Sequence, residues 1–99
     1  VQRRQGRTMK IIRKHFYFSG RVQGVGFRYK AMYLARGLEL TGWVANLWDG
    51  RVEMEVQGPP EKISMLLLRL KEDRYISIDQ IQSVGQPIRE GEKSFQVKG

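Results

Sequence analysis

With 99 residues, 40% of them hydrophobic and 28% charged, the chain has the size and composition of one globular domain with a modest core. It contains no cysteine and one histidine, which excludes a disulfide framework and a thiolate nucleophile and argues against a histidine-rich metal site, and no apolar run reaches the roughly 18 residues that cross a membrane. The net charge of +8 favours anionic partners, either small phosphates or nucleic acid, and with no signal peptide in view we expect a cytoplasmic protein.

The first eight residues carry three arginines and show no hydrophobic periodicity. The chain begins with Val1 rather than methionine, whereas Met9 opens a patterned segment. We therefore expect residues 1–8 to be a disordered extension or a tag and residues 9–99 to form a single domain. Without those three arginines, 15 basic residues still face 10 acidic ones, so the domain itself remains basic.

The first predicted element is a strand from Lys10 to Ser19. Ile12, Phe16 and Phe18 share one side of it, and charged and polar residues occupy the other. His15 belongs to that second side, where we expect a surface residue and not a catalytic one.

A glycine-rich segment from Gly20 to Arg28, with the sequence GRVQGVGFR, joins this strand to a predicted helix. Arg28 and Lys30 fall in the first helical turn, where a cation costs about 0.3–1 kcal/mol, and no Ser, Thr, Asp or Asn precedes them as a cap. A bound anion would remove both conflicts, because exposed helix N–H groups and a cation attract the same partner. Glycines alone are equally typical of a tight connection, but N–H groups that converge beside a guanidinium favour a phosphate site.

The helix after this segment is predicted from one apolar stripe. Phe27, Ala31, Leu34 and Ala35 recur at helical spacing, and Gly37 is expected to end the helix as a C-terminal cap.

A hairpin follows, with strands predicted at Leu40–Leu47 and Val52–Gln57. Asp49-Gly50 between them is typical of a two-residue turn. In the register of such a turn, Asn46 faces Glu53 across the hairpin.

Three side chains of this hairpin are of interest for a site. Trp43 falls on the apolar face of the predicted register and is expected in the core, whereas Trp48, beside the turn, is expected to be the more exposed of the two tryptophans. Asn46 is more often a polar residue near a turn than a group that orients water, and the residues alone leave both interpretations open.

A second helix is predicted to begin at Gly58-Pro59-Pro60-Glu61, because proline in the first turn and an acid near the positive end of the helix dipole are typical of helix starts. Its buried stripe is Ile63, Leu66, Leu67 and Leu70, and we expect its Met and Leu residues to belong to the core. A loop at 71–77 and a strand at 78–84 follow, and the run at 94–98 allows a short further strand.

The order of these elements predicts the fold class. Strand, helix, strand, strand, helix, strand is the order of the α+β, ferredoxin-like split β-α-β sandwich (βαββαβ), with one antiparallel sheet and both helices on one face.

Two segments of the chain resemble signatures of the acylphosphatase family. GRVQGVGFR at Gly20–Arg28 resembles the family's phosphate loop along its whole length, and GWVAN at Gly42–Asn46 followed by DGRVE at Asp49–Glu53 resembles its second signature at the expected separation. The resemblance covers roughly Lys10 to Val97. It departs at residues 71–77, where many members have Gly-Pro, and at Trp48, which is bulky for its place.

The resemblance implies a ferredoxin-like sandwich that hydrolyses acyl phosphates, mixed anhydrides of a carboxyl group and phosphate, to a carboxylate and inorganic phosphate. Arg28 and Asn46 would be catalytic, with Asn46 holding the attacking water. The phosphate would be bound by Val22, Gln23, Gly24, Val25, Gly26, Phe27 and Arg28. The family uses no metal and no organic cofactor, and we expect a monomer whose partners are a small-molecule acyl phosphate and inorganic phosphate, with no nucleic acid and no membrane.

Two alternatives remain open. The first is an acylphosphatase-like module that binds phosphate or carbamoyl phosphate without free-standing hydrolysis, as in the carbamoyl-phosphate-handling domain of hydrogenase-maturation carbamoyltransferases. The second is a ferredoxin-like nucleic-acid-binding domain, suggested by the basic charge; it is disfavoured because Glu53 and Glu55 would face the phosphates on the predicted open face of the sheet.

Overall fold

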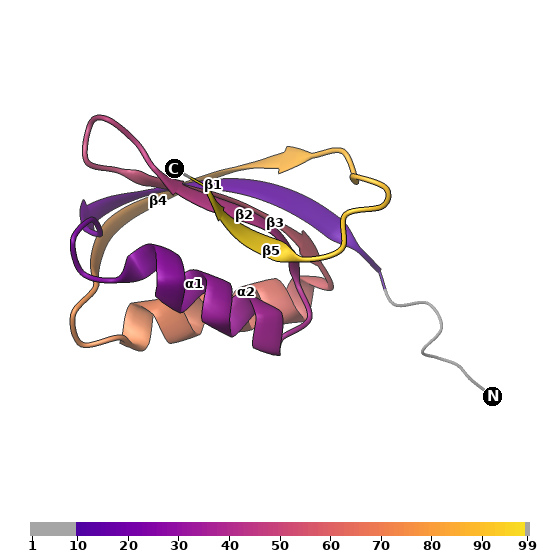
Figure 1. Cartoon of the computed structure of the whole chain (residues 1–99), viewed down its shortest axis with the longest axis horizontal. Helices are drawn as coiled ribbons and strands as arrows, with labels where there is room; N and C mark the ends of the chain where they lie inside the picture. The colour runs from indigo at the N-terminus through magenta and orange to yellow at the C-terminus, as the bar shows by residue number, and fades with distance from the viewer. Residues whose placement is uncertain (1–9, 99) are drawn as a thin grey trace.

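The computed structural model describes residues 10–98, which form two helices packed on one face of a five-stranded sheet (Figure 1). This arrangement confirms the predicted ferredoxin-like fold with a short additional strand. The predicted extension, residues 1–8, lies outside the described residues. In chain order the elements are β1 (Ile12–Arg21), α1 (Phe27–Gly37), β2 (Thr41–Asn46), β3 (Val52–Gly58), α2 (Pro60–Glu72), β4 (Ser77–Gln86) and β5 (Phe95–Lys98).

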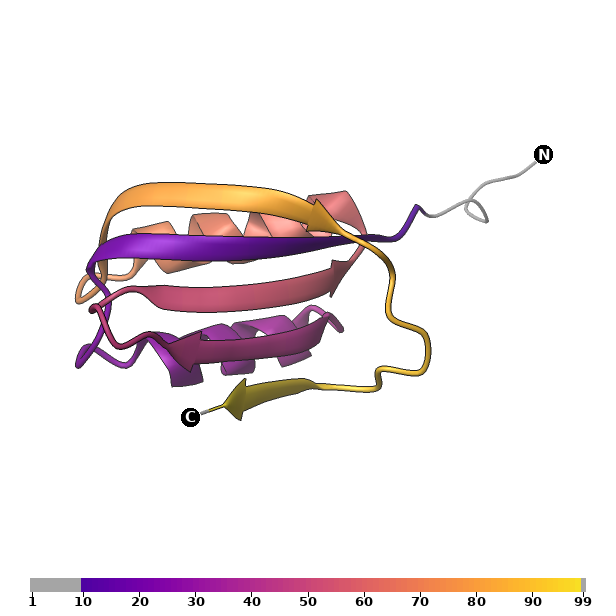
Figure 2. The same ribbon diagram turned by 90° about the horizontal axis from the view of Figure 1, so that it is seen from above.

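The strand order across the sheet is β4-β1-β3-β2-β5. β1 pairs with β3 and β4, and β2 pairs with β3, all antiparallel, as the fold predicts. β5 pairs with β2 in parallel, so the complete sheet is mixed. The connection after β4 passes around one end of the sheet and brings β5 to the opposite edge, where it runs in the direction of β2 (Figure 2).

The core lies between the sheet and the two helices and consists of aliphatic and aromatic side chains. Phe18 near the end of β1 and Phe27 at the start of α1 are both inaccessible, and their ring centroids lie 4.9 Å apart. Burying a side chain of this size stabilises the fold by roughly 1.5–3 kcal/mol. This contact holds the start of α1 above the end of β1 and thereby anchors both ends of the segment between them.

Helix α2 begins at Pro60 as predicted, and its predicted stripe faces the core. Met65 and Leu68, however, were expected in the core and are exposed, because they lie off that stripe. Within residues 10–98, no helix has the length and apolarity needed to cross a membrane.

Helix α1 begins at Phe27, where its apolar stripe begins, but the prediction of Gly37 as its C-terminal cap is wrong. The helix runs through Gly37, Leu38 is the C-terminal cap residue, and the residue with positive φ is Glu39 (φ 61°). The turn is closed by the N–H of Leu40, which donates to the carbonyl of Ala35 at 2.8 Å.

The hairpin register predicted from Asp49-Gly50 is wrong by one residue. Asn46 pairs with Val52, not with Glu53. The loop has three residues, because the N–H of Gly50 donates to the carbonyl of Leu47 at 3.2 Å and Gly50 adopts φ 95°. A turn followed by one left-handed glycine is the usual form of a three-residue hairpin loop.

The shift exchanges the faces of β2. Trp43, expected in the core, lies on the open face of the sheet opposite Glu55, and Asn46 shares the helix-facing side with buried Val44.

His15 was predicted at the surface and is buried, with 8% of its surface exposed. It lies on the open face of the sheet, where Tyr17 and Trp43 approach its ring with centroid distances of 4.9 Å and 5.4 Å. Long neighbouring side chains cover this face although no helix packs on it. The alternation of residues along one strand therefore could not predict that His15 is buried.

Candidate functional site

Three connections meet at one end of the sheet: the segment after β1, the β2–β3 loop and the α2–β4 connection (Figures 1 and 2). β1 and β2 both run antiparallel to β3, so they point the same way and terminate at the same end of the sheet. This topology brings Arg21 and Asn46, the last residues of β1 and β2, to the same end of the sheet, although they are far apart in the sequence.

Residues 22–27, called here the glycine loop, turn the chain from β1 into α1. Gly24 and Gly26 adopt left-handed conformations with φ 75° and 83°. A Cβ built on either glycine would meet no atom within 4 Å, so backbone conformation and not lack of space requires glycine there. Gly26 is the N-cap of α1, and neither a capping side chain nor an acid occupies the start of this helix.

The main-chain N–H groups of the glycine loop are available donors. Among residues 10–98, no main-chain carbonyl accepts a hydrogen bond from the N–H groups of residues 23–27, and the first such bond joins the Lys30 N–H to the Gly26 carbonyl at 3.0 Å. Successive N–H groups in a glycine-containing turn, followed by a helix N-terminus, form a concave site for an anion.

A side chain of the glycine loop fastens it to the hairpin. Gln23 Nε2 donates to the carbonyl of Leu47 at 2.6 Å and to that of Arg51 at 2.9 Å. Leu47 follows Asn46 directly, so these two bonds fix the position of the loop relative to the end of β2. Gln23 was predicted only to bind phosphate, and this second role was not predictable because a main-chain acceptor leaves no mark in a sequence.

Arg28 and Lys30 lie in the first turn of α1, as predicted. The Lys30 ammonium pairs with Asp73 Oδ2 at 3.2 Å, so the chain itself compensates this cation at the helix start. The Tyr75 N–H donates to Asp73 Oδ1 at 2.8 Å; that bond and then the Lys30 pairing lower the pKa of Asp73. The Arg28 guanidinium carbon lies 5.8 Å from the ring centroid of Tyr29.

Asn46 is half-buried at the end of β2, on the helix-facing side of the sheet and next to the residue that Gln23 holds. The corrected register is what places it on the side where the glycine loop enters α1. Its carboxamide offers both a donor and an acceptor at this position.

Within residues 10–98, no cluster of three or more His, Asp or Glu side chains has the arrangement of a metal site. Next to the main-chain N–H groups of the glycine loop, Arg28 lies in the first turn of α1 and Asn46 at the end of β2. N–H groups, a guanidinium and a carboxamide are each able to bind or orient an oxyanion.

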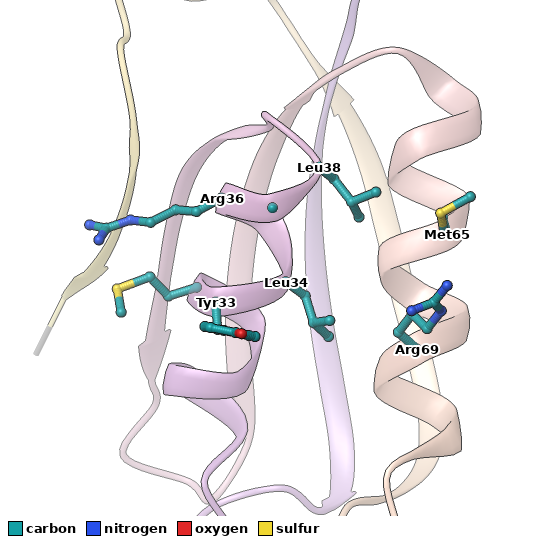
Figure 3. A pocket seen from close by; sticks show the side chains of 8 residues that line it. Tyr33, Leu34, Arg36, Leu38, Met65 and Arg69 are labelled. Carbon is teal, nitrogen blue, oxygen red and sulfur yellow. The ribbon is translucent and has the colours of Figure 1, made fainter.

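A hollow of about 580 Å³ lies between the C-terminal half of α1 and the middle of α2 (Figure 3). Leu34, Leu38 and Met65 line it, and Arg36 points away from α2, its Nε donating to the Phe95 carbonyl at 3.0 Å. Most of its lining residues are apolar, with Arg36 and Arg69 at the sides, and it has no row of main-chain N–H groups like that of the glycine loop.

Comparison with known sequences identifies related proteins. A model of the Acylphosphatase family matches residues 14–97. The acylphosphatase of Clostridium beijerinckii is 39% identical over 89 residues, which cover 89% of this chain and 99% of that protein. The acylphosphatase of Thermococcus kodakarensis is 49% identical over 59 residues, which cover 60% of this chain and 65% of that protein.

Solved structures agree with the sequence matches. The acylphosphatase from Bacillus subtilis matches with a TM-score of 0.81 at 31% identity, over 89% of this chain and 99% of that one. A full-length HypF in its phosphate- and nucleotide-bound form contains a region that matches with a TM-score of 0.80 at 28% identity, over 96% of this chain and 13% of HypF.

Proposed function

The chain belongs to the acylphosphatase family, and we propose that its glycine loop, Arg28 and Asn46 form the active site for this family's reaction. The reaction is the hydrolysis of an acyl phosphate at its carboxyl–phosphate bond, which yields a carboxylate and inorganic phosphate. What remains to be assigned is how the residues of this chain perform it.

The phosphate is held by the N–H groups of residues 22–27 together with the guanidinium of Arg28. The left-handed glycines and the available N–H groups support this assignment. The planar guanidinium can hold two phosphate oxygens at once, which a lysine cannot do. These donors are fixed before the substrate arrives and face the oxygens on which charge concentrates during phosphoryl transfer.

Asn46 orients the attacking water in line with the leaving oxygen. An acyl phosphate is already activated, because its leaving group is a carboxylate that needs little protonation. Positioning and electrostatic stabilisation can therefore supply most of the catalysis. A phosphate oxygen of the substrate accepts the proton of the water, which requires no separate general base.

The observation that carries the proposal is the pair of hydrogen bonds from Gln23 to the hairpin. They join the loop that would bind phosphate to the strand end that would bind water. Misplacing the bound phosphate and the attacking water by 1 Å relative to each other can lower the rate about 10²-fold. Direct hydrogen bonds between the glycine loop and the hairpin therefore help catalysis by fixing their spacing.

The proposal is tested with benzoyl phosphate, assayed without metal and again with a chelator. We expect wild-type hydrolysis well above the uncatalysed rate in both cases. Asn46→Ala should lower kcat about 10- to 100-fold while inorganic phosphate inhibits as strongly as before, because the water and not the phosphate has lost its partner.

Gln82→Ala removes an exposed carboxamide of β4 and serves as the matched control. Full activity of Asn46→Ala would refute the role of Asn46, and inhibition of the wild type by the chelator would refute the metal-independent mechanism.

A binding module is the second candidate, favoured by the match to HypF in its phosphate- and nucleotide-bound form. It predicts phosphate binding at the glycine loop without turnover of benzoyl phosphate. The same assay separates the two functions, provided that phosphate binding is measured in parallel by calorimetry.

We expect neither nucleic acid nor a second copy of the chain as an obligate partner. The aromatic rings of the open face are already covered by cations: the Arg51 guanidinium carbon lies 5.1 Å from the Tyr17 centroid, and Lys98 Nζ lies 4.4 Å from that of Trp43. Glu55 lies among them. Rings covered in this way are not free to stack on bases.

A further inference from the structure

A polar cavity of about 640 Å³ opens beside the glycine loop. Arg21, Gly24 and Val25 line it from β1 and the loop. Arg74 and Tyr75 from the α2–β4 connection and Ser77 and Asp79 from β4 line the rest. The connection belongs to the segment, residues 71–77, in which the sequence departs from the pattern common in its family.

The sheet order places this cavity on the opposite side of the glycine loop from Asn46. β1, which leads into the loop, has β4 as one neighbour and β3 followed by β2 on its other side (Figure 2). Arg74 and Asp79 flank the β4 side, whereas Asn46 ends β2. A phosphate held by the loop would have the cavity on its β4 side and Asn46 on its β2 side.

Phosphoryl transfer to water requires the attacking and leaving oxygens to lie roughly in line through phosphorus. With water held at Asn46, the leaving carboxylate points toward the β4 side and the rest of the acyl group enters the cavity. Resting on the proposed function, we propose that this cavity binds the acyl part of the substrate and selects acyl phosphates whose acyl group carries a second anionic group.

The charges around the cavity support that class of substrate. Arg21 and Arg74 are both exposed and make no ion pair within residues 10–98. The Arg74 guanidinium carbon lies 5.7 Å from the ring centroid of Tyr75, and this contact favours one position of the guanidinium at the rim.

One carboxylate among the lining residues opposes the two guanidinium groups. Asp79 lies against the end of β1, since a Cβ built on Gly20 would come within 3.2 Å of its Cγ. The neighbouring Asp73 is already engaged by Lys30 and by the Tyr75 N–H. The lining thus keeps an excess of positive charge, and Asp79 moderates it.

The test compares kcat/KM for two substrates of the same shape, 4-carboxybenzoyl phosphate and benzoyl phosphate, each corrected for its uncatalysed hydrolysis. The measured quantity is the ratio of the two values. We expect the ratio to fall about 3- to 10-fold in Arg74→Gln and to rise by a similar factor in Asp79→Asn, because a single charge beside a partly exposed anion has an effect of this order. The wild-type ratio should also fall as salt is added.

Arg69→Gln, which removes a cation from α2 beside the other hollow, is the matched control and should leave the ratio unchanged. A ratio that stays within two-fold in both Arg74→Gln and Asp79→Asn, in an enzyme that hydrolyses both substrates, overturns the inference and leaves the proposed function intact. Hydrolysis of neither substrate by the wild type overturns the proposed function and this inference with it.

Discussion

The open face of the sheet and the glycine-loop end use the same kinds of polar groups for opposite purposes. On the open face, Arg13 Nη1 lies 2.8 Å from Glu92 and 3.0 Å from Gln57, Arg13 Nε donates to Glu55, and His15 Nδ1 lies 2.6 Å from the same Glu55. At the glycine loop, a row of main-chain N–H groups has no acceptor within residues 10–98.

The partners of a charged or polar group separate a structural role from a functional one. A buried charge is tolerated when the fold supplies its partners, and Arg13, with 3% of its surface exposed, has them. Main-chain N–H groups of the glycine loop that no main-chain carbonyl of residues 10–98 engages are, in our proposal, available to a ligand. The completeness of the surrounding contacts, and not the residue type, distinguishes the two regions.

The pKa shifts agree with this division. The hydrogen bond from Arg13 to Glu92 contributes most to raising the pKa of Arg13. Burial alone would raise the pKa of Glu55, but the bonds from His15 and Arg13 lower it below the ordinary glutamate value. Burial opposes the shift of Glu92 in the same way, and its bonds with Arg13 and Thr41 lower its pKa.

Arg28→Ala is the change that should separate the two regions most strongly. Removing the guanidinium takes a charged donor from the oxyanion site, so we expect kcat/KM for benzoyl phosphate to fall about 10³-fold and phosphate inhibition to be lost. Arg28→Lys should recover part of the activity, because the charge returns without the two-pronged geometry. More than a tenth of wild-type activity in the alanine variant would contradict the assignment.

Arg13→Ala should show the opposite pattern. The change leaves two carboxylates, Glu55 and Glu92, close together without their cation, and we expect the free energy of unfolding to fall by about 3 kcal/mol. Urea unfolding measures this, and the activity per folded molecule should remain that of the wild type. Lys14→Ala, on the neighbouring position of the same strand, is the control; an equal loss in both variants would show that the network contributes nothing specific.

Most of the fold was predictable because its signals are local. The alternation in β1, the apolar stripe that begins at Phe27 and the prolines at the start of α2 each lie within or next to the element that they define. The glycine loop was predictable for the same reason, since its glycines and Arg28 are contiguous in the sequence.

The contacts that cross the sheet were not predictable. Asp49-Gly50 is compatible with a two-residue and with a three-residue loop, because both place glycine at positive φ, and the choice between them decides which faces Trp43 and Asn46 occupy. Arg13 is buried through Glu55 and Glu92, 42 and 79 residues away, and no local pattern shows such partners.

Gln23→Leu tests whether the contact between the loop and the hairpin serves catalysis. The substitution keeps side-chain bulk but removes both hydrogen bonds to the carbonyls of Leu47 and Arg51. We expect kcat to fall about 10-fold because the loop and Asn46 lose their fixed spacing, and stability to fall by about 1–2 kcal/mol. A variant with the stability loss and unchanged kcat would show that the contact serves the fold alone.

The smallest expected effect is the acid dependence of the open-face network. The pKa of Glu92 is lowered in the folded protein below the ordinary 4.5 of the unfolded state. Its carboxylate therefore contributes its full stabilisation above the unfolded-state pKa. This contribution is lost as the pH falls through the lower folded-state pKa. Glu92→Gln should therefore be less stable than the wild type by about 1 kcal/mol at pH 7, and the gap should narrow as the pH falls below about 4.5.

Urea unfolding at several pH values measures the gap between Glu92→Gln and the wild type, with the exposed neighbour Glu90→Gln as the control. A gap for Glu92→Gln that is the same at pH 3 and pH 7 would show that the ionised carboxylate is not what stabilises Arg13. Neither substitution should change the activity per folded molecule, because this network lies on the open face of the sheet and the glycine loop turns toward the helices. An acid-dependent difference in stability without a difference in turnover is therefore the result that distinguishes a closed network from an open site.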